Sequence, residues 1–134
     1  MQNKYTEITP NNLIDFLTVF YGKIRKHDIL GNIFEIHIGT NENEWKEHII
    51  HISTFWSSII LKTRNFQGTP MQVHQSMPEL RAEHFPMWLE IFHSTALEKY
   101  TENMAQVFIE YSQRIGQSLS MGVEIHRQKM GEDY

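Results

Sequence analysis

The stretch "GTPMQVHQSMP", residues 68–78, places one histidine, His74, between two prolines. Proline fixes φ and lacks an amide hydrogen, so Pro70 favours the first turn of a helix and Pro78 discourages that turn from continuing. The stretch lies within residues 62–84, a long connection without sustained periodicity, and such connections are either functional or disordered. Taken alone, a histidine in this setting is most often a solvated loop residue.

The composition is that of a soluble globular protein: 134 residues, of which 40% are hydrophobic and 21% charged. We expect a single domain over residues 1–134, with a frayed tail at 130–134. The net charge of −4 and the lack of a basic stripe argue against a nucleic-acid partner. No apolar run has the length of a signal peptide or of a membrane helix, so we expect a cytoplasmic protein that does not contact membranes.

Helical periodicity begins near the N-terminus. Thr9 and Pro10 predict the N-cap and the first position of a helix, which the apolar spacing extends to about Ile24. Gly31 is interpreted as the terminator of a short second turn, which would place Phe34 in a connection.

Three further helices are predicted, and no run of residues alternates as a strand would. A second long helix is expected from an N-cap at Thr40 to about Lys62. Another carries Trp88 and Phe92 on one stripe, and a last one is predicted to follow a cap at Thr101. The pattern predicts an all-α fold.

The chain has no cysteine and eight histidines. Disulfides, iron–sulfur clusters and cysteine zinc sites are therefore excluded, which leaves histidine as the metal ligand to consider. His48 and His51 have the spacing H-x-x-H, but a catalytic zinc site needs a third ligand, so this signal is weak. Solvated side chains are the default for four more histidines that lie among charged or turn residues, namely His27, His37, His84 and His126.

Three polar side chains fall on inward-facing stripes of three different helices. Tyr21 lies on the first helix, Trp88 lies on the third, and His48 shares the face of the second with Ile52 and Phe55. Tyr21 and Trp88, each taken alone, are most often ordinary core residues, and His48 alone is most often a histidine whose ring reaches solvent. Together they would bring three hydrogen-bond donors around a buried acceptor.

These motifs, in this order, resemble the truncated haemoglobins, most closely group III, over nearly the whole chain. "FYGKIR" (20–25) resembles the B helix with its pocket tyrosine, here Tyr21, and "ILGNIF" (29–34) resembles the turn that carries the haem-packing phenylalanine, here Phe34. "EWKEHIIHISTFW" (44–56) resembles the E helix, with the distal histidine at His48.

The opening stretch resembles the family's proximal segment, which makes His74 the ligand of the haem iron. "HFPMWLEIF" (84–92) resembles the G helix with its distal tryptophan, here Trp88. The resemblance implies a globin-like fold shortened to a two-over-two helical sandwich. It also implies haem b (iron protoporphyrin IX) as cofactor, with contacts from Phe34, Ile52, Phe55, His74, Met77 and Phe92.

The function implied is binding of O₂, and of other diatomic ligands such as NO or CO, at a histidine-ligated iron, with Tyr21, His48 and Trp88 stabilising the ligand. Oxygen handling and nitric oxide detoxification both remain open as roles, and we expect a monomeric bacterial protein served by a separate reductase. One alternative is a peroxidase in which His48 moves protons. A second is a haem-free helical module that binds a partner helix.

Overall fold

The structure, a computed structural model, describes residues 3–130, so most of the tail expected at 130–134 lies outside the described residues. Within that range the chain is helical, as expected, and its one extended pairing is a bridge between Tyr5 and Tyr100. The helices are α1 (Pro10–Lys26), α2 (Leu30–Ile38), α3 (Glu42–Ile60), α4 (Pro70–Gln75), α5 (His84–Lys99) and α6 (Glu102–Lys129).

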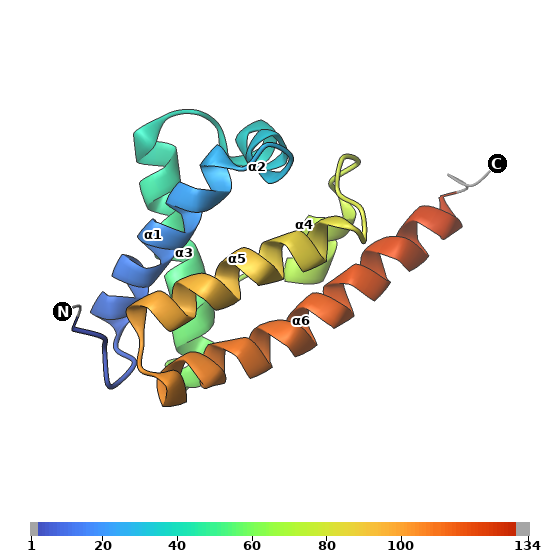
Figure 1. Cartoon of the computed structure of the whole chain (residues 1–134). Helices are drawn as coiled ribbons and strands as arrows, with labels where there is room; N and C mark the ends of the chain where they lie inside the picture. Colours follow the sequence, from blue (N-terminus) through green and yellow to red (C-terminus); the bar gives the residue numbers. More distant parts are fainter. Residues whose placement is uncertain (1–2, 131–134) are drawn as a thin grey trace.

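The long helices pair as the two-over-two arrangement requires. α1 packs on α3, α5 packs on α6, and contacts between α1 and α5 join the two pairs. Figure 1 shows α5 and α6 running side by side across α1 and α3, with the short α4 close to the second half of α6. The all-α, two-over-two fold is therefore confirmed.

Aromatic side chains form the centre of the core. Phe16, Phe20, Phe92 and Phe108 are fully buried, and Phe16 lies within 5.1 Å of the Phe92 ring and 4.8 Å of the Phe108 ring between centroids. Burying one such side chain contributes about 1.5–3 kcal/mol. Packing between the helix pairs therefore holds α1, α5 and α6 in place.

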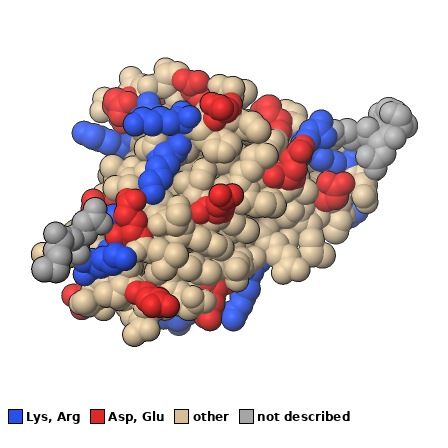
Figure 2. Space-filling model, in the orientation of Figure 1, with Lys and Arg blue, Asp and Glu red and all other residues tan. Residues whose placement is uncertain are grey.

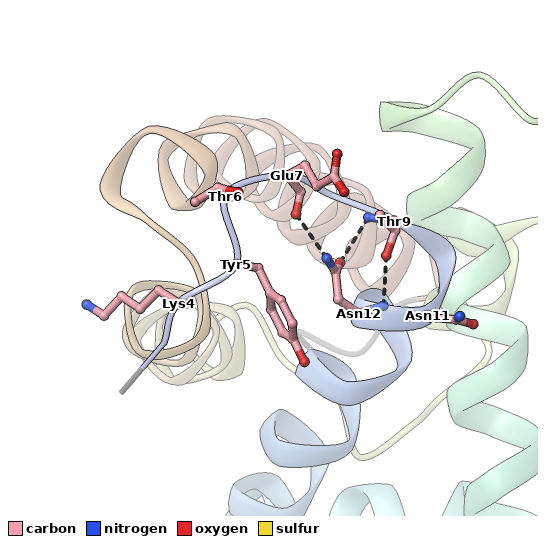
Figure 3. Close-up of a pocket in the computed structure, with 7 residues that line it drawn as sticks. All are labelled: Lys4, Tyr5, Thr6, Glu7, Thr9, Asn11 and Asn12. Carbon is pink, nitrogen blue, oxygen red and sulfur yellow. Dashed lines mark hydrogen bonds between the residues drawn. The ribbon is translucent and has the colours of Figure 1, made fainter. Parts of the chain in front are cut away.

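The start of α1 agrees with the sequence prediction. The Thr9 hydroxyl accepts from the Asn12 amide and the Asn12 side chain accepts from the Thr9 amide, with Pro10 at the first position. A shallow hollow of about 430 Å³ lies at this corner (Figure 3). Its Asn12 side chain also donates to the Glu7 carbonyl and accepts from the Tyr100 hydroxyl, so we interpret the hollow as structural.

The prediction for Gly31 and Phe34 was wrong. Both residues lie inside α2, and no turn ends at Gly31. A Cβ on Gly31 would lie 2.7 Å from the Arg25 carbonyl oxygen. Glycine is needed there because α2 starts against the end of α1, and a pattern cannot separate this use of glycine from helix termination.

The bounds of α3 also differ from the prediction. The N-cap is Asn41 and not Thr40, because the Asn41 side chain accepts from the Asn43 amide at 2.7 Å. The helix ends at Ile60, before Lys62, which has a φ of 62°. That left-handed conformation turns the chain away from the helix axis.

Charges of both signs are interspersed on the face that Figure 2 shows, with wide areas of uncharged side chains between them. Among residues 3–130, no helix combines the length and the apolar character that a membrane span requires.

Candidate functional site

The candidate site is a cavity of about 300 Å³ lined by residues from all six helices. Its lining is mostly apolar, as is typical of cofactor pockets. The structure brings together most of the predicted site residues in this lining: Tyr21, Phe34, His48, Ile52, Phe55, His74, Met77 and Trp88. One predicted contact residue, Phe92, is absent from it.

Phe92 lies behind the wall of the cavity. Its ring is fully buried and stacks on Trp88 at 4.8 Å and on Trp56 at 5.0 Å, with interplanar angles of 11° and 22°. The two indoles line the cavity and cover Phe92. The helical stripe placed Phe92 on the inward face correctly, but periodicity does not tell a wall residue from the residue that supports it.

The first half of the lining, which we call the distal wall, contains Tyr21, His48 and Trp88. The ring centroids of Tyr21 and His48 are 5.0 Å apart, edge to face, and Trp88 packs edge to face on Phe20 at 5.4 Å. Three helices thus present one polar side chain each to the same cavity. This arrangement is the one that the sequence predicted.

His48 carries an unpaired polar atom. Its Nε2 is buried and has no hydrogen-bond partner among the described residues. Burial, with a smaller contribution from His51, lowers the pKa of His48 to about 4, so the ring is neutral at neutral pH. A buried polar atom without a partner costs about 1–3 kcal/mol, which a bound ligand could recover.

The other two distal side chains are hydrogen-bond donors. Burial raises the pKa of Tyr21, so its hydroxyl keeps its proton, and the Trp88 indole can only donate. A third indole nearby, that of Trp45, already donates to the Gly39 carbonyl at 2.9 Å. Tyr21 and Trp88 are therefore the donors that the distal wall can offer to a ligand.

The second half of the lining, which we call the proximal wall, contains Val73, His74, Met77 and Phe85. His74 lies on the short helix α4, which begins at Pro70 as predicted. Its Nδ1 donates to the Pro70 carbonyl at 2.5 Å, which fixes the tautomer because a carbonyl can only accept. Nε2 is then the nitrogen left to act as a metal ligand.

Burial also acts on His74. It lowers the pKa of His74, and the hydrogen bond to the Pro70 carbonyl opposes that shift. The ring is thus held neutral and oriented by a backbone acceptor, the arrangement typical of metal-binding histidines. The ring of Phe85 lies 6.2 Å away between centroids.

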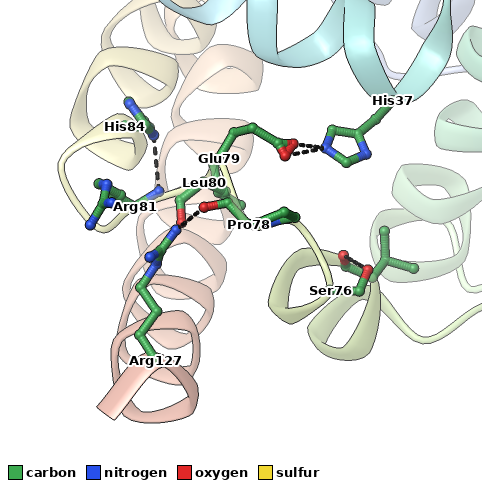
Figure 4. Close-up of polar contacts among 9 residues, drawn as sticks. His37, Ser76, Pro78, Glu79, Leu80, Arg81, His84 and Arg127 are labelled. Atoms are coloured by element: carbon green, nitrogen blue, oxygen red, sulfur yellow. Dashed lines mark hydrogen bonds and ion pairs between the residues drawn. The ribbon is translucent and has the colours of Figure 1, made fainter. Parts of the chain in front are cut away.

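Two histidines that the sequence suggested were solvated contribute to the cavity. His84 is buried, and its Nδ1 accepts from the Arg81 amide at 3.0 Å (Figure 4). His37 lies at the edge of the cavity and contacts the Glu79 carboxylate at 2.7 Å. The charged residues next to His84 in the sequence wrongly predicted that its side chain is exposed. No pattern in the sequence predicts the contact between His37 and Glu79.

The residues present fit a haem. The cavity is largely apolar, as a porphyrin requires, and the proximal wall offers one imidazole with a fixed tautomer and a free Nε2. The distal wall offers an unpaired Nε2 on His48 and two donors. Among residues 3–130 there is no cluster of three acidic, histidine or cysteine side chains that could hold a bare metal ion.

Comparison with known proteins agrees with this site. No family model matches the chain. The group 3 truncated hemoglobin ctb of Campylobacter jejuni is 34% identical over 112 residues, which are 84% of this chain and 88% of that protein. The crystal structure of a group III truncated hemoglobin from Campylobacter jejuni superposes with a TM-score of 0.87 at 31% identity, covering 90% of this chain and 95% of that one. The chain therefore belongs to the group III truncated haemoglobins, and membership in this family implies a haem cofactor.

Proposed function

We propose that this protein binds haem b through His74 and holds a diatomic ligand, O₂ in the first place, against the distal wall. The observation that carries the proposal is the pairing of two histidines in one cavity. His74 has its Nδ1 tied to the Pro70 carbonyl, and His48 has a buried Nε2 without a partner among the described residues. When bound, haem supplies the iron at which such a ligand is held.

The chain's own residues then orient and stabilise the ligand. Tyr21 and Trp88 donate from α1 and α5, and His48 donates or accepts according to its tautomer. A hydrogen bond to a charged acceptor contributes about 1.5–3 kcal/mol, which slows dissociation about ten- to a hundredfold. Slow release suits storage or chemistry better than delivery, and we favour reaction with nitric oxide or oxygen handling over transport.

The test is the visible absorption of the purified protein during titration with haem. We expect saturation at one haem per chain and distinct spectra for the ferrous protein alone, with CO and with O₂. Failure to bind haem at one equivalent would refute the proposal and favour a haem-free helical module.

A peroxidase activity is the second candidate, and the neutral state of His48 favours it. A buried imidazole with a pKa near 4 is unprotonated at neutral pH and is able to accept a proton from a peroxide in the cavity. Steady-state turnover of hydrogen peroxide by the wild type and by His48→Leu separates the candidates. A peroxidase role requires turnover that His48→Leu abolishes, whereas a ligand-binding role predicts slow turnover in both.

The proposal also places the protein in the bacterial cytoplasm as a monomer that depends on a separate reductase. The chain has no cysteine, so it carries no dithiol of its own to reduce a bound iron. Sedimentation of the haem-loaded protein tests the monomer, and reduction by a clarified extract tests the need for a partner.

A further inference from the structure

If His74 binds the haem iron, as the proposed function on which this inference rests requires, the helix that carries it must be held in a fixed position. α4 has only six residues and none of them is buried. Within residues 3–130, α6 is the helix against which α4 packs closely. Helices this short are not stable by themselves in water, so the contact with α6 must set the position of α4.

The contact is built on a glycine of α6. A Cβ on Gly122 would lie 2.7 Å from the Cε of Met71 and closer still to its sulfur. Real Cβ atoms essentially never come so close, so a side chain at position 122 would displace the flexible thioether end of Met71 from the contact between α4 and α6. The Met71 side chain therefore lies in the space that a side chain at position 122 would otherwise fill.

A hydrogen bond fixes the same contact. The Gln75 side-chain nitrogen donates to the Gly122 carbonyl at 3.1 Å. Met71 and Gln75 are four residues apart and share the face of α4 toward α6, whereas His74 and Pro70 share the face toward the cavity. A shift of the first face therefore moves the second.

Further along α6, Arg127 holds the chain that leaves α4. Its guanidinium donates to the carbonyls of Pro78 and Leu80, as Figure 4 shows, and the bond to Leu80 measures 3.0 Å. Arg127 and Gly122 are five residues apart on one helix. Together they hold the proximal segment on both sides of His74.

We propose that Gly122, through its contacts with Met71 and Gln75, is a positioning residue that sets the orientation of the His74 imidazole toward the haem. It touches neither the cavity nor the reacting atoms, since the lining contains Gly116 and Leu119 of α6 but not Gly122. Its effect passes through α4. Groups that hydrogen-bond a metal-ligating histidine typically change metal affinity by about 10–100-fold, and because Gly122 lies one contact further out we expect its effect at the lower end of that range.

The test compares Gly122→Val with Gly22→Val in the haem-loaded protein. Gly22 is an exposed helical glycine whose added Cβ would meet nothing within 4 Å, which makes it the matched control. Two quantities are measured: the iron–imidazole stretching band in the resonance Raman spectrum of the ferrous protein, and the rate of haem transfer to an excess of a haem-scavenging globin. We expect Gly122→Val to shift the band and to speed haem loss about tenfold, and Gly22→Val to change neither.

A rescue separates positioning from general damage. Met71→Ala removes the atoms with which the introduced valine side chain collides, so adding it to Gly122→Val is expected to return the band toward its wild-type position. Gln75→Leu keeps the volume and removes only the hydrogen bond, and we expect a smaller band shift in the same direction. If Gly122→Val does not fold, Gln75→Leu alone decides.

An unchanged band in the folded Gly122→Val and Gln75→Leu variants would overturn the inference. That result is distinct from failure of the proposed function. If the wild type shows no iron–imidazole band, or if His74→Gly keeps it, the ligand assignment is wrong. If the band is lost in His74→Gly but is unchanged in the Gly122 and Gln75 variants, only the positioning role is wrong.

Discussion

The distal and proximal walls of the cavity are built in different ways. The distal wall stands on long helices whose aromatic side chains are packed in the core, with Trp45, Trp56 and Tyr21 each less than 5% exposed. On the proximal wall, Val73 and His74 lie on α4, which buries none of its six residues, whereas Phe85 is a buried residue of α5. A few specific contacts hold α4 and the chain that follows it, among them Gln75 to Gly122 and Arg127 to Leu80.

The two halves of the site are therefore sensitive to different kinds of substitution. Many packing contacts hold the distal wall in place, so its shape depends on the stability of the whole fold. On the proximal side, α4 is held by a few hydrogen bonds and one close approach beside a small apolar cluster of Leu80, Phe85 and Val123, so local changes can move His74 while the main core stays intact.

Removing the ring behind the distal wall should cost the most stability. Phe92→Ala leaves a cavity between Trp56 and Trp88 and is expected to lower the free energy of unfolding by about 3–5 kcal/mol. Val73→Ala on the proximal wall, where the side chain is 49% exposed, should cost less than about 1 kcal/mol. Urea denaturation followed by circular dichroism measures both, and equal losses would contradict the contrast.

The pH dependence of stability should come in part from His48. Its imidazole binds a proton near pH 6.5 when unfolded but only near pH 4 in the fold, so the unfolded state binds more protons between these values. The free energy of unfolding should therefore fall as the pH falls from about 6.5 to 4, by at most about 3 kcal/mol from this residue.

The matched variant for this effect is His48→Leu, which removes the titrating group and keeps an apolar side chain. The pKa values of His74 and His84 are also lowered by burial, so some loss of stability in acid will remain. The difference between the two proteins is the quantity to measure by urea denaturation at pH 7, 6, 5 and 4. Parallel curves would show that His48 is not held neutral by burial.

Among the distal donors, Trp88 should dominate the release of O₂. Trp88→Phe keeps most of the ring volume and deletes one donor, so O₂ dissociation from the ferrous protein should speed up at least about tenfold. His48→Leu should change the rate less, because Tyr21 can still donate. Stopped-flow measurement of O₂ release gives both rates. A parental rate in Trp88→Phe with a much faster one in His48→Leu would reverse the assignment.

The elements that the sequence predicted best are those whose signals are local. Thr9 and Pro10 start α1, and Pro70 starts α4, because capping and the fixed φ of proline act within one turn. The apolar stripes of the long helices are also local. They predicted which faces of these helices point inward, and Tyr21 and Trp88 were found in this way, whereas His48 was identified as a distal residue by the resemblance to the family.

What failed or was missed depends on contacts between distant segments. A glycine at position 31 gives the same sequence pattern whether it ends a helix or lets one helix approach another. The close approach of the Arg25 carbonyl in the structure shows that the second use applies. His84 lies among charged residues in the sequence and yet is buried. The close approach of Gly122 to Met71 joins positions far apart in the chain, so no window of sequence contains it.

The role of His74 as the iron ligand is tested by the spectrum of His74→Gly in the presence and absence of imidazole. We predict that the ferrous and ferric spectra of this variant differ from those of the wild type, and that haem is lost or poorly retained. Added imidazole should restore both spectra, because the free ring can occupy the space of the missing side chain and offer a nitrogen to the iron. His51→Ala, a histidine at the exposed rim of the cavity, should leave both spectra as they are. Wild-type spectra from His74→Gly without imidazole would show that His74 does not hold the iron.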